Sequence, residues 1–256
     1  MRFTKTALTL CLTMGIALTT LTPLSSHAAD YAREAKWADE VTPSVLTGDP
    51  VWLEIPSGHK FLTLYTEADA SKIKAKTGVI VIHGMGVHPD WGLIGPLRQN
   101  LPEYGYATLS IQMPVLKADA KGDEYPATFD EAAERIKIAQ EFLAAKGYQK
   151  IVLLTHSMGG RMTARYLDKN PQANVSAWVA IGAPAVLNYD KLKFPILDLY
   201  GENDLPQVLK SAKARAKGLS GNAKSMQQIA PKADHFFNGY DAPLLDAVKQ
   251  YLDKTL

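Results

Sequence analysis

Ser157 lies where an apolar run gives way to a helical pattern. Ile151 to Thr155 predicts a buried strand, and the residues from Arg161 to Asn170 predict a helix. A serine in such a turn projects its hydroxyl from the sheet edge, and Gly159, two residues later, lets helix and strand approach closely. The free N–H groups at the helix start would face a developing oxyanion. This stretch therefore predicts a hydroxyl nucleophile for acyl transfer.

The run Thr155-His156-Ser157-Met158-Gly159 resembles the Gly-x-Ser-x-Gly elbow of the α/β-hydrolase superfamily, with Thr155 in place of the first glycine. The resemblance implies a triad whose acid and histidine follow later strands, in the chain order serine, acid, histidine. Asp204 ends a Gly-x-x-Asp turn after the apolar run Phe194 to Tyr200, and His235 follows the last predicted strand. A helix-capping aspartate and an ordinary loop histidine would not explain both placements. We therefore expect Ser157, Asp204 and His235 to be the catalytic residues.

A fourth segment follows the apolar run Val79 to Ile82. His83-Gly84-Met85-Gly86 is similar to the His-Gly loop with which the superfamily completes its oxyanion hole. That similarity implies N–H donors at Met85 and at Met158. The residues expected to contact substrate around this loop are His83, Gly84, His88 and Trp91, with His83 mainly orienting the loop.

No metal or cofactor is expected. His83, His88 and Asp90 have side chains that bind zinc, but their spacing matches no zinc motif. The chain contains neither the Gly-x-x-x-x-Gly-Lys phosphate loop nor the Gly-x-Gly-x-x-Gly fingerprint of dinucleotide-binding proteins. The expected partner is a small-molecule acyl substrate, and the oligomeric state is left open.

The first 28 residues predict a secretory signal peptide. Arg2 and Lys5 precede a long uncharged apolar stretch, and Ser26-His27-Ala28 has small residues at its first and third positions. Cleavage after Ala28 would remove Cys11, the only cysteine, and would leave 26 basic and 26 acidic residues. A lipoprotein signal is disfavoured because Leu10 precedes that cysteine. We expect a periplasmic or secreted protein with no stable membrane anchor, and a neutral chain argues against nucleic-acid binding.

The remaining chain alternates strands and helices. Residues 29–50 are expected to form an N-terminal extension over the surface, and residues 51–256 a single α/β-hydrolase domain. The runs 51–55 and 60–66 flank a Pro-Ser-Gly turn and predict an antiparallel hairpin. A helix is predicted over 129–146, with Thr128 and Glu131 as a capping box. The fold class is α/β, with a mostly parallel central sheet and helices on both faces.

These features predict a serine hydrolase that cleaves a carboxylic ester or a related acyl bond. Only about a dozen residues separate Ala183 from Phe194, which is too few for a separate lid, so the site should be open. Two alternatives remain: a peptidase or acyltransferase on the same scaffold, and a non-catalytic exported binding protein with a hydrolase fold.

Overall fold

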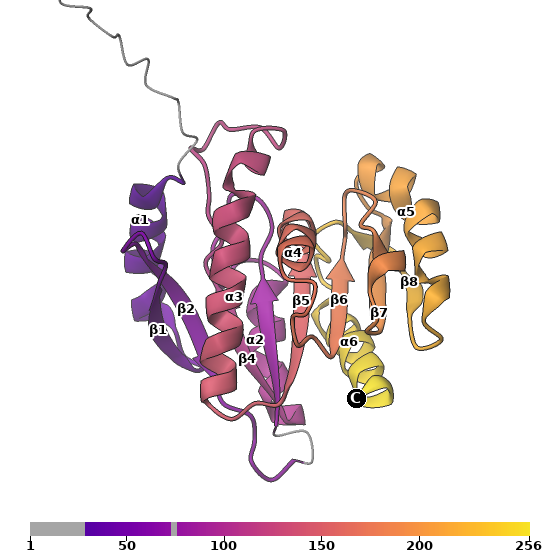
Figure 1. The fold of residues 1–256 in the computed structure, drawn as a ribbon, viewed down its shortest axis with the longest axis horizontal. Coiled ribbons are helices and arrows are strands. Elements are labelled where there is room, and N and C mark those ends of the chain that lie inside the picture. Colours follow the sequence, from indigo (N-terminus) through magenta and orange to yellow (C-terminus); the bar gives the residue numbers. More distant parts are fainter. Residues whose placement is uncertain (1–28, 73–75) are drawn as a thin grey trace, which may run out of the picture.

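The computed structural model describes residues 29–72 and 76–256, and the expected signal segment at 1–28 lies outside them. An eight-stranded sheet with the order β1-β2-β4-β3-β5-β6-β7-β8 runs through the molecule (Figure 1). The strands are β1 Asp49–Glu54, β2 Lys60–Thr66, β3 Thr77–Ile82, β4 Tyr106–Ile111, β5 Lys150–His156, β6 Ala177–Ile181, β7 Ile196–Asn203 and β8 Met226–Asp234. β1 and β2 form the predicted antiparallel hairpin, β2 pairs antiparallel with β4, and all other neighbours are parallel. The α/β architecture predicted from the sequence is confirmed.

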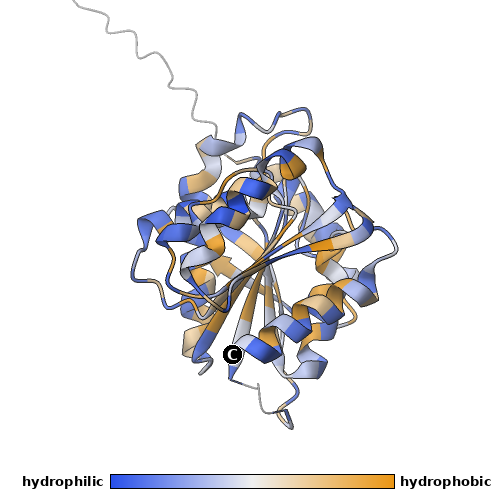
Figure 2. Ribbon diagram, turned by 90° about the vertical axis from the view of Figure 1, so that its right-hand side faces the viewer, coloured by the Kyte–Doolittle hydropathy of each residue, from blue (hydrophilic) through white to orange (hydrophobic). Residues whose placement is uncertain are grey.

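Helices cover both faces of the sheet. They are α1 Tyr31–Val41, α2 Ile94–Asn100, α3 Phe129–Ala145, α4 Met158–Lys169, α5 Pro206–Gly218 and α6 Asp241–Thr255. Helices α3 and α4 lie in front of the sheet in Figure 1, and α2 and α6 lie behind it. Figure 2 shows the apolar strands enclosed between helices whose outer faces are hydrophilic.

The alternation of side chains explains why the central strands are apolar at every position. In β3, Val79 and Val81 pack toward α2 and α6, whereas Ile80 and Ile82 pack toward α3 and α4. All four side chains are fully buried, as expected for a strand covered on both faces. One hydrophobic core therefore packs on each face of the sheet, and together they fix the position of the carboxyl ends of its strands.

Three further helical turns shape the connections: η1 Thr42–Ser44, η2 Leu101–Tyr104 and η3 Tyr125–Thr128. Short turns at η4 Tyr189–Lys191 and η5 Leu219–Gly221 follow β6 and α5. The connection from β6 to β7 contains η4 alone, in keeping with the predicted absence of a separate lid.

The capping box predicted for α3 is wrong. Thr128 has helical backbone angles, makes no side-chain cap, and donates its hydroxyl to the Tyr125 carbonyl at 2.8 Å. The Glu131 carboxylate binds Arg135 and the Tyr31 hydroxyl instead of reaching back to the helix start. The turn η3 leads directly into α3, so no extended residue is available to act as a cap.

Residues 29–50 are more than a surface covering. Helix α1 packs Ala38 and Val41 against Leu62 and Leu64 of β2. Asp30 accepts a hydrogen bond from the Arg33 N–H at 3.0 Å and caps the helix start. Side chains of α1 contact the loops at the carboxyl ends of the strands, at Gly86 and Leu116.

Candidate active site

Ser157 occupies a strained turn between β5 and α4. Its backbone has φ 53° and ψ −120°, a conformation that side-chain-bearing residues rarely adopt. A Cβ atom at Gly159 would stand only 2.7 Å from the His83 carbonyl oxygen. The glycine is therefore required for α4 to approach β3, and the strained serine presents its hydroxyl above the sheet edge.

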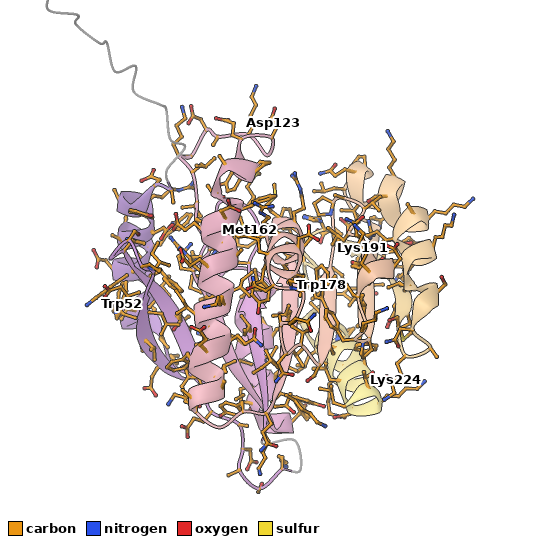
Figure 3. The ribbon with its side chains drawn as sticks, in the orientation of Figure 1. Trp52, Asp123, Met162, Trp178, Lys191 and Lys224 are labelled. Carbon is orange, nitrogen blue, oxygen red and sulfur yellow. The ribbon has the colours of Figure 1, made fainter. Side chains whose placement is uncertain are left out.

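The Thr155 departure from the superfamily pattern has a structural account. Its side chain is fully buried, and its hydroxyl accepts a hydrogen bond from the Trp178 indole N–H at 2.9 Å. Trp178 lies on β6 beneath α4, where Figure 3 labels it near Met162. The threonine thus anchors the elbow strand to its neighbour.

The structure brings the three predicted triad side chains together in a line. The Ser157 hydroxyl lies 2.9 Å from His235 Nε2, and His235 Nδ1 lies 2.6 Å from Asp204 Oδ1. The carboxylate also accepts the N–H of Gly201 on Oδ2 at 3.1 Å and the N–H of Leu205 on Oδ1 at 2.7 Å. Asp204 and His235 are both about 5% exposed or less.

These contacts keep Asp204 ionised. Burial raises the pKa of Asp204, but the hydrogen bonds from His235, Gly201 and Leu205 outweigh it and hold the pKa below its ordinary value. A carboxylate can only accept from His235, so Nδ1 carries the proton and Nε2 is free to accept the Ser157 hydroxyl. This is the arrangement of a general base and its orienting acid.

Asp198, an acidic residue in the buried part of β7, binds other partners than His235. Its carboxylate is fully buried and accepts from Arg215 at 2.9 Å, from Gln227 at 2.6 Å and from Tyr189 at 3.3 Å. Its contacts run to α5 and η4, so it does not reach His235.

The loop after β3 packs directly against the elbow. A Cβ atom at Gly84 would stand 3.2 Å from the Ser157 Cβ, so this loop lies against the serine and only glycine fits without displacement. Met85 follows Gly84 in the loop, and Met158 is the first residue of α4, where backbone N–H groups have no intrahelical partner. The two residues predicted to supply the oxyanion-hole N–H groups thus lie in segments that adjoin Ser157.

His83 does not line the pocket and is better described as a structural residue of the loop. It is fully buried, and its Nε2 accepts the Met113 N–H at 2.9 Å. Nδ1 therefore carries the proton and donates to the Gly84 carbonyl at 2.8 Å. Burial lowers the pKa of His83 to about 3. His83 was expected to contact substrate, but its ring is buried and instead holds the loop in place.

A pocket of about 440 Å³ opens beside Ser157 and His235. Of the predicted substrate-contact residues, Gly84 and Trp91 line it, whereas His88 packs its ring on Trp37 and lies outside. The remaining walls come from several loops and helix starts: Met85, Val87, Gly122, His156, Met158, Arg161, Pro184, Ala185, Leu205, Gln207 and Phe236. A second cavity of about 510 Å³, lined by Leu167 and Trp178 among others, contains no triad residue, so volume alone does not locate the site.

Sequence reasoning missed several pocket residues, and two of them, Phe236 and His156, contact His235. Phe236 is 43% exposed, and its ring meets those of Trp91 and His235 edge-on at 5.6 and 5.1 Å. His156 Nε2 donates to the His235 carbonyl oxygen at 3.0 Å and thereby holds the backbone at His235 in place. Both residues are sequence neighbours of triad members, which is the signal that could have found them.

Burial and the neighbouring His235 lower the pKa of His156 to about 4. The unfolded chain has histidine pKa values near 6.5, so below that pH it binds protons that folded His83 and His156 exclude. The free energy of unfolding should therefore fall as the pH drops from about 6.5 toward 4, by up to ~1.4 kcal/mol per pH unit for each histidine.

Urea unfolding of wild type and His156→Gln between pH 4.5 and 8 tests this expectation. Gln retains an N–H donor for the His235 carbonyl, so the difference at pH 8 reports the packing change alone. The variant should lose less stability on acidification than wild type. Equal slopes would show that His156 is not excluded from protonation.

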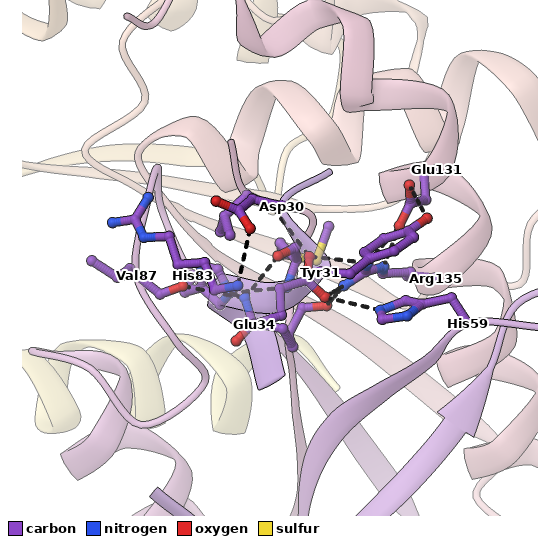
Figure 4. Close-up of polar contacts among 12 residues, drawn as sticks. Asp30, Tyr31, Glu34, His59, His83, Val87, Glu131 and Arg135 are labelled. Carbon is purple, nitrogen blue, oxygen red and sulfur yellow. Dashed lines mark hydrogen bonds and ion pairs between the residues drawn. The ribbon is translucent and has the colours of Figure 1, made fainter. Parts of the chain in front are cut away.

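Helix α1 is tied to the same loops through a buried network (Figure 4). Arg33 donates to the Gly86 carbonyl at 3.1 Å and to the Leu116 carbonyl at 2.7 Å. Glu34, which is 4% exposed, pairs with fully buried Arg135 at 2.9 Å. Arg135 in turn donates to the Gln112 carbonyl at 2.9 Å. The segment predicted to lie over the surface therefore supports both the loop after β3, at Gly86, and the residues after β4, Gln112 and Met113, that bind His83.

Neither a metal site nor a membrane span is found in the part of the chain that the structure describes. No group of three His, Cys, Asp or Glu side chains within residues 29–72 and 76–256 is arranged to hold a metal ion. Asp90 is bound instead by fully buried Arg98 at 2.5 Å. In the same ranges no helix is long and apolar enough to cross a bilayer.

Comparison with solved structures shows the α/β-hydrolase fold. A lidless α/β serine hydrolase from Xanthomonas campestris is 16% identical, with a TM-score of 0.64 over 83% of this chain and 96% of that one. Est1E from Butyrivibrio proteoclasticus, solved with ferulic acid, is 15% identical, with a TM-score of 0.65 over 80% and 98%. Dienelactone hydrolase from Anabaena variabilis is 19% identical, with a TM-score of 0.62 over 81% and 97%. At these identities the likeness establishes the fold alone.

No curated protein matches the chain significantly. The model of one protein family matches it over residues 46–133 and 116–231, which together include the elbow and the acid turn. The chain thus has the fold of the α/β hydrolases, and it belongs to the family described as "Protein of unknown function (DUF3530)".

Proposed function

We propose that this protein is a serine hydrolase that cleaves a carboxylic ester or a related acyl bond through an acyl-enzyme. The observation that carries the proposal is the continuous contact from Asp204 through His235 to Ser157, at 2.6 and 2.9 Å, at the edge of a pocket. The strained elbow and the glycine loop beside it support the same reaction.

In the proposed reaction, His235 Nε2 takes the Ser157 proton as Oγ attacks the acyl carbonyl. Asp204 holds the imidazole in the required tautomer and stabilises the imidazolium. The N–H groups of Met85 and Met158 would bind the oxyanion, where one donor typically contributes about 2.7–4 kcal/mol. His235 then protonates the leaving group, and water releases the acyl group by the same steps.

The walls nearest Ser157 favour a short apolar chain next to the scissile carbonyl. Met85, Trp91, Met158 and Phe236 surround the approach to Ser157, and the volume of about 440 Å³ suits a substrate of modest size. The absence of a lid between β6 and β7 leaves the pocket open to solvent.

Labelling with a fluorophosphonate probe tests the proposal, because the probe reacts with activated serines. Wild-type protein should be labelled at Ser157, as mapped by peptide mass spectrometry, and Ser157→Ala should not be labelled. Folded wild type that stays unlabelled would instead favour a non-catalytic binding protein. Ester, peptide and acyl-acceptor panels then separate an esterase from a peptidase or an acyltransferase on the same scaffold.

A further inference from the structure

Arg161 gives the pocket a positive charge that nothing in its lining neutralises. The pocket residues include two histidines and one arginine but no aspartate or glutamate. The buried histidine His156 is neutral at ordinary pH, since its pKa is about 4. Asp204, the nearest acid along the chain to the wall residue Leu205, is already bound to His235. The cationic side chain of Arg161 thus lines a pocket that has no acidic side chain in its walls.

The contacts of Arg161 set it apart from the other arginines. Its guanidinium lies 3.6 Å from Met158 Sδ and 5.2 Å from the centre of the Phe129 ring. No carboxylate in residues 29–72 or 76–256 pairs with it, whereas four other arginines have acidic partners: Arg98 with Asp90, Arg135 with Glu34, Arg165 with Asp130 and Arg215 with Asp198. Arg33 donates to two carbonyls.

The helix geometry places this charge near the nucleophile. Arg161 follows Ser157 by four residues, which corresponds to a rise of about 6 Å along α4. Side chains on a helix lean toward its N-terminus, so the guanidinium of Arg161 turns back toward the elbow, where it meets Met158. Packing on the Phe129 ring holds the planar group in place.

We propose that the substrate carries a carboxylate a short spacer away from the scissile carbonyl, and that Arg161 binds it. This inference rests on the proposed hydrolase function. A guanidinium matches the geometry of a carboxylate with two parallel N–H donors, and the charge on both groups strengthens these hydrogen bonds. The substrate class is therefore the monoester of a short dicarboxylic acid, or a similar acid ester.

The test compares monoethyl glutarate and monoethyl adipate with the neutral diethyl esters of the same chains. For each variant the readout is the ratio of kcat/KM for monoester to that for diester at pH 8. Arg161→Gln should lower this ratio by about 10- to 100-fold, since a charge-assisted hydrogen bond to a carboxylate is lost. The ratio for Arg161→Lys should lie between those of wild type and Arg161→Gln, because lysine keeps the charge but lacks the two parallel N–H donors. The control is Arg165→Gln, one turn further on α4 and paired with Asp130 outside the pocket, which should leave the ratio at the wild-type value.

A second measurement is independent of turnover. Monoethyl adipate should slow fluorophosphonate labelling of wild type and of Arg165→Gln, but not of Arg161→Gln. The inference is overturned if labelled wild type is not protected, or if Arg161→Gln leaves the monoester-to-diester ratio unchanged. It is also overturned if Arg165→Gln lowers the ratio as much as Arg161→Gln does. The loss would then come from the net charge of the protein and not from a contact with Arg161. Failure of wild type to react with the probe at all would refute the proposed function instead.

Discussion

Asp204→Asn is expected to lower kcat by about 10⁴-fold while the protein stays folded. With the amide nitrogen of asparagine in the place of Oδ1, its oxygen keeps the N–H of Gly201 that now binds Oδ2, whereas the N–H of Leu205 loses its acceptor on Oδ1. The asparagine amide group would then face His235 Nδ1 as a donor. The imidazole must accept that hydrogen bond on Nδ1 and carry its own proton on Nε2, where it can no longer receive the Ser157 proton.

The matched control is Asp198→Asn, which changes an acidic residue on the adjoining strand. Asp198 binds Arg215, Gln227 and Tyr189 and does not contact His235. This variant should lose stability because Arg215 is fully buried, but its folded fraction should keep the catalytic relay. Ester hydrolysis at low temperature and the far-ultraviolet circular dichroism of each variant separate the two effects. If Asp198→Asn and not Asp204→Asn abolished turnover of folded protein, the assignment of the triad acid would be wrong.

Arg135→Met is expected to reduce the free energy of unfolding by about 3–5 kcal/mol. Arg135 is fully buried and binds Glu34 on α1, Glu131 one turn earlier on α3, and the Gln112 carbonyl. Its removal leaves the Glu34 carboxylate, which is 4% exposed, without the arginine and with the His59 imidazole at 3.2 Å and the Val115 N–H at 3.3 Å as its remaining partners. An uncompensated buried charge is far more unfavourable than a lost surface pair.

A double-mutant cycle identifies the cause of this loss. Glu34→Gln neutralises the stranded carboxylate, so Glu34→Gln with Arg135→Met should be about 2 kcal/mol or more stable than Arg135→Met alone. Lys137→Met on the same helix is the control, because its pair with Glu141 at 2.7 Å is more than half exposed and should contribute under about 1 kcal/mol. Urea unfolding measures wild type, Glu34→Gln, Arg135→Met, the double variant and Lys137→Met. Equal losses for Arg135→Met and Lys137→Met would show that the network does not hold α1 through buried charge.

Periodicity and local motifs carried most of the fold prediction. The run Val79 to Ile82 is apolar at every position because both of its faces are covered, and the hairpin is marked by the turn between its strands. The capping box predicted for α3 was wrong for a local reason. The turn η3 gives Thr128 helical backbone angles, and the spacing of Thr128 and Glu131 does not indicate that turn. Residues 29–50 were predicted to lie over the surface, and their buried ion pair was missed. Glu34 and Arg135 are 101 residues apart, and no local pattern connects them.

The sequence by itself determined the order and type of the chemical groups: a serine at a strand-to-helix turn, then an acid and a histidine after later strands. It could do so because each group follows a strand, and parallel strands bring their carboxyl ends to one edge. Only the tertiary structure decided which groups share a pocket. His83 and His88, which were predicted to contact substrate, lie outside the pocket, whereas Arg161 and Phe236, which were not predicted, line it. Pocket walls come from loops and helix faces whose side-chain directions depend on packing between distant segments, and spacing along the chain does not encode those directions.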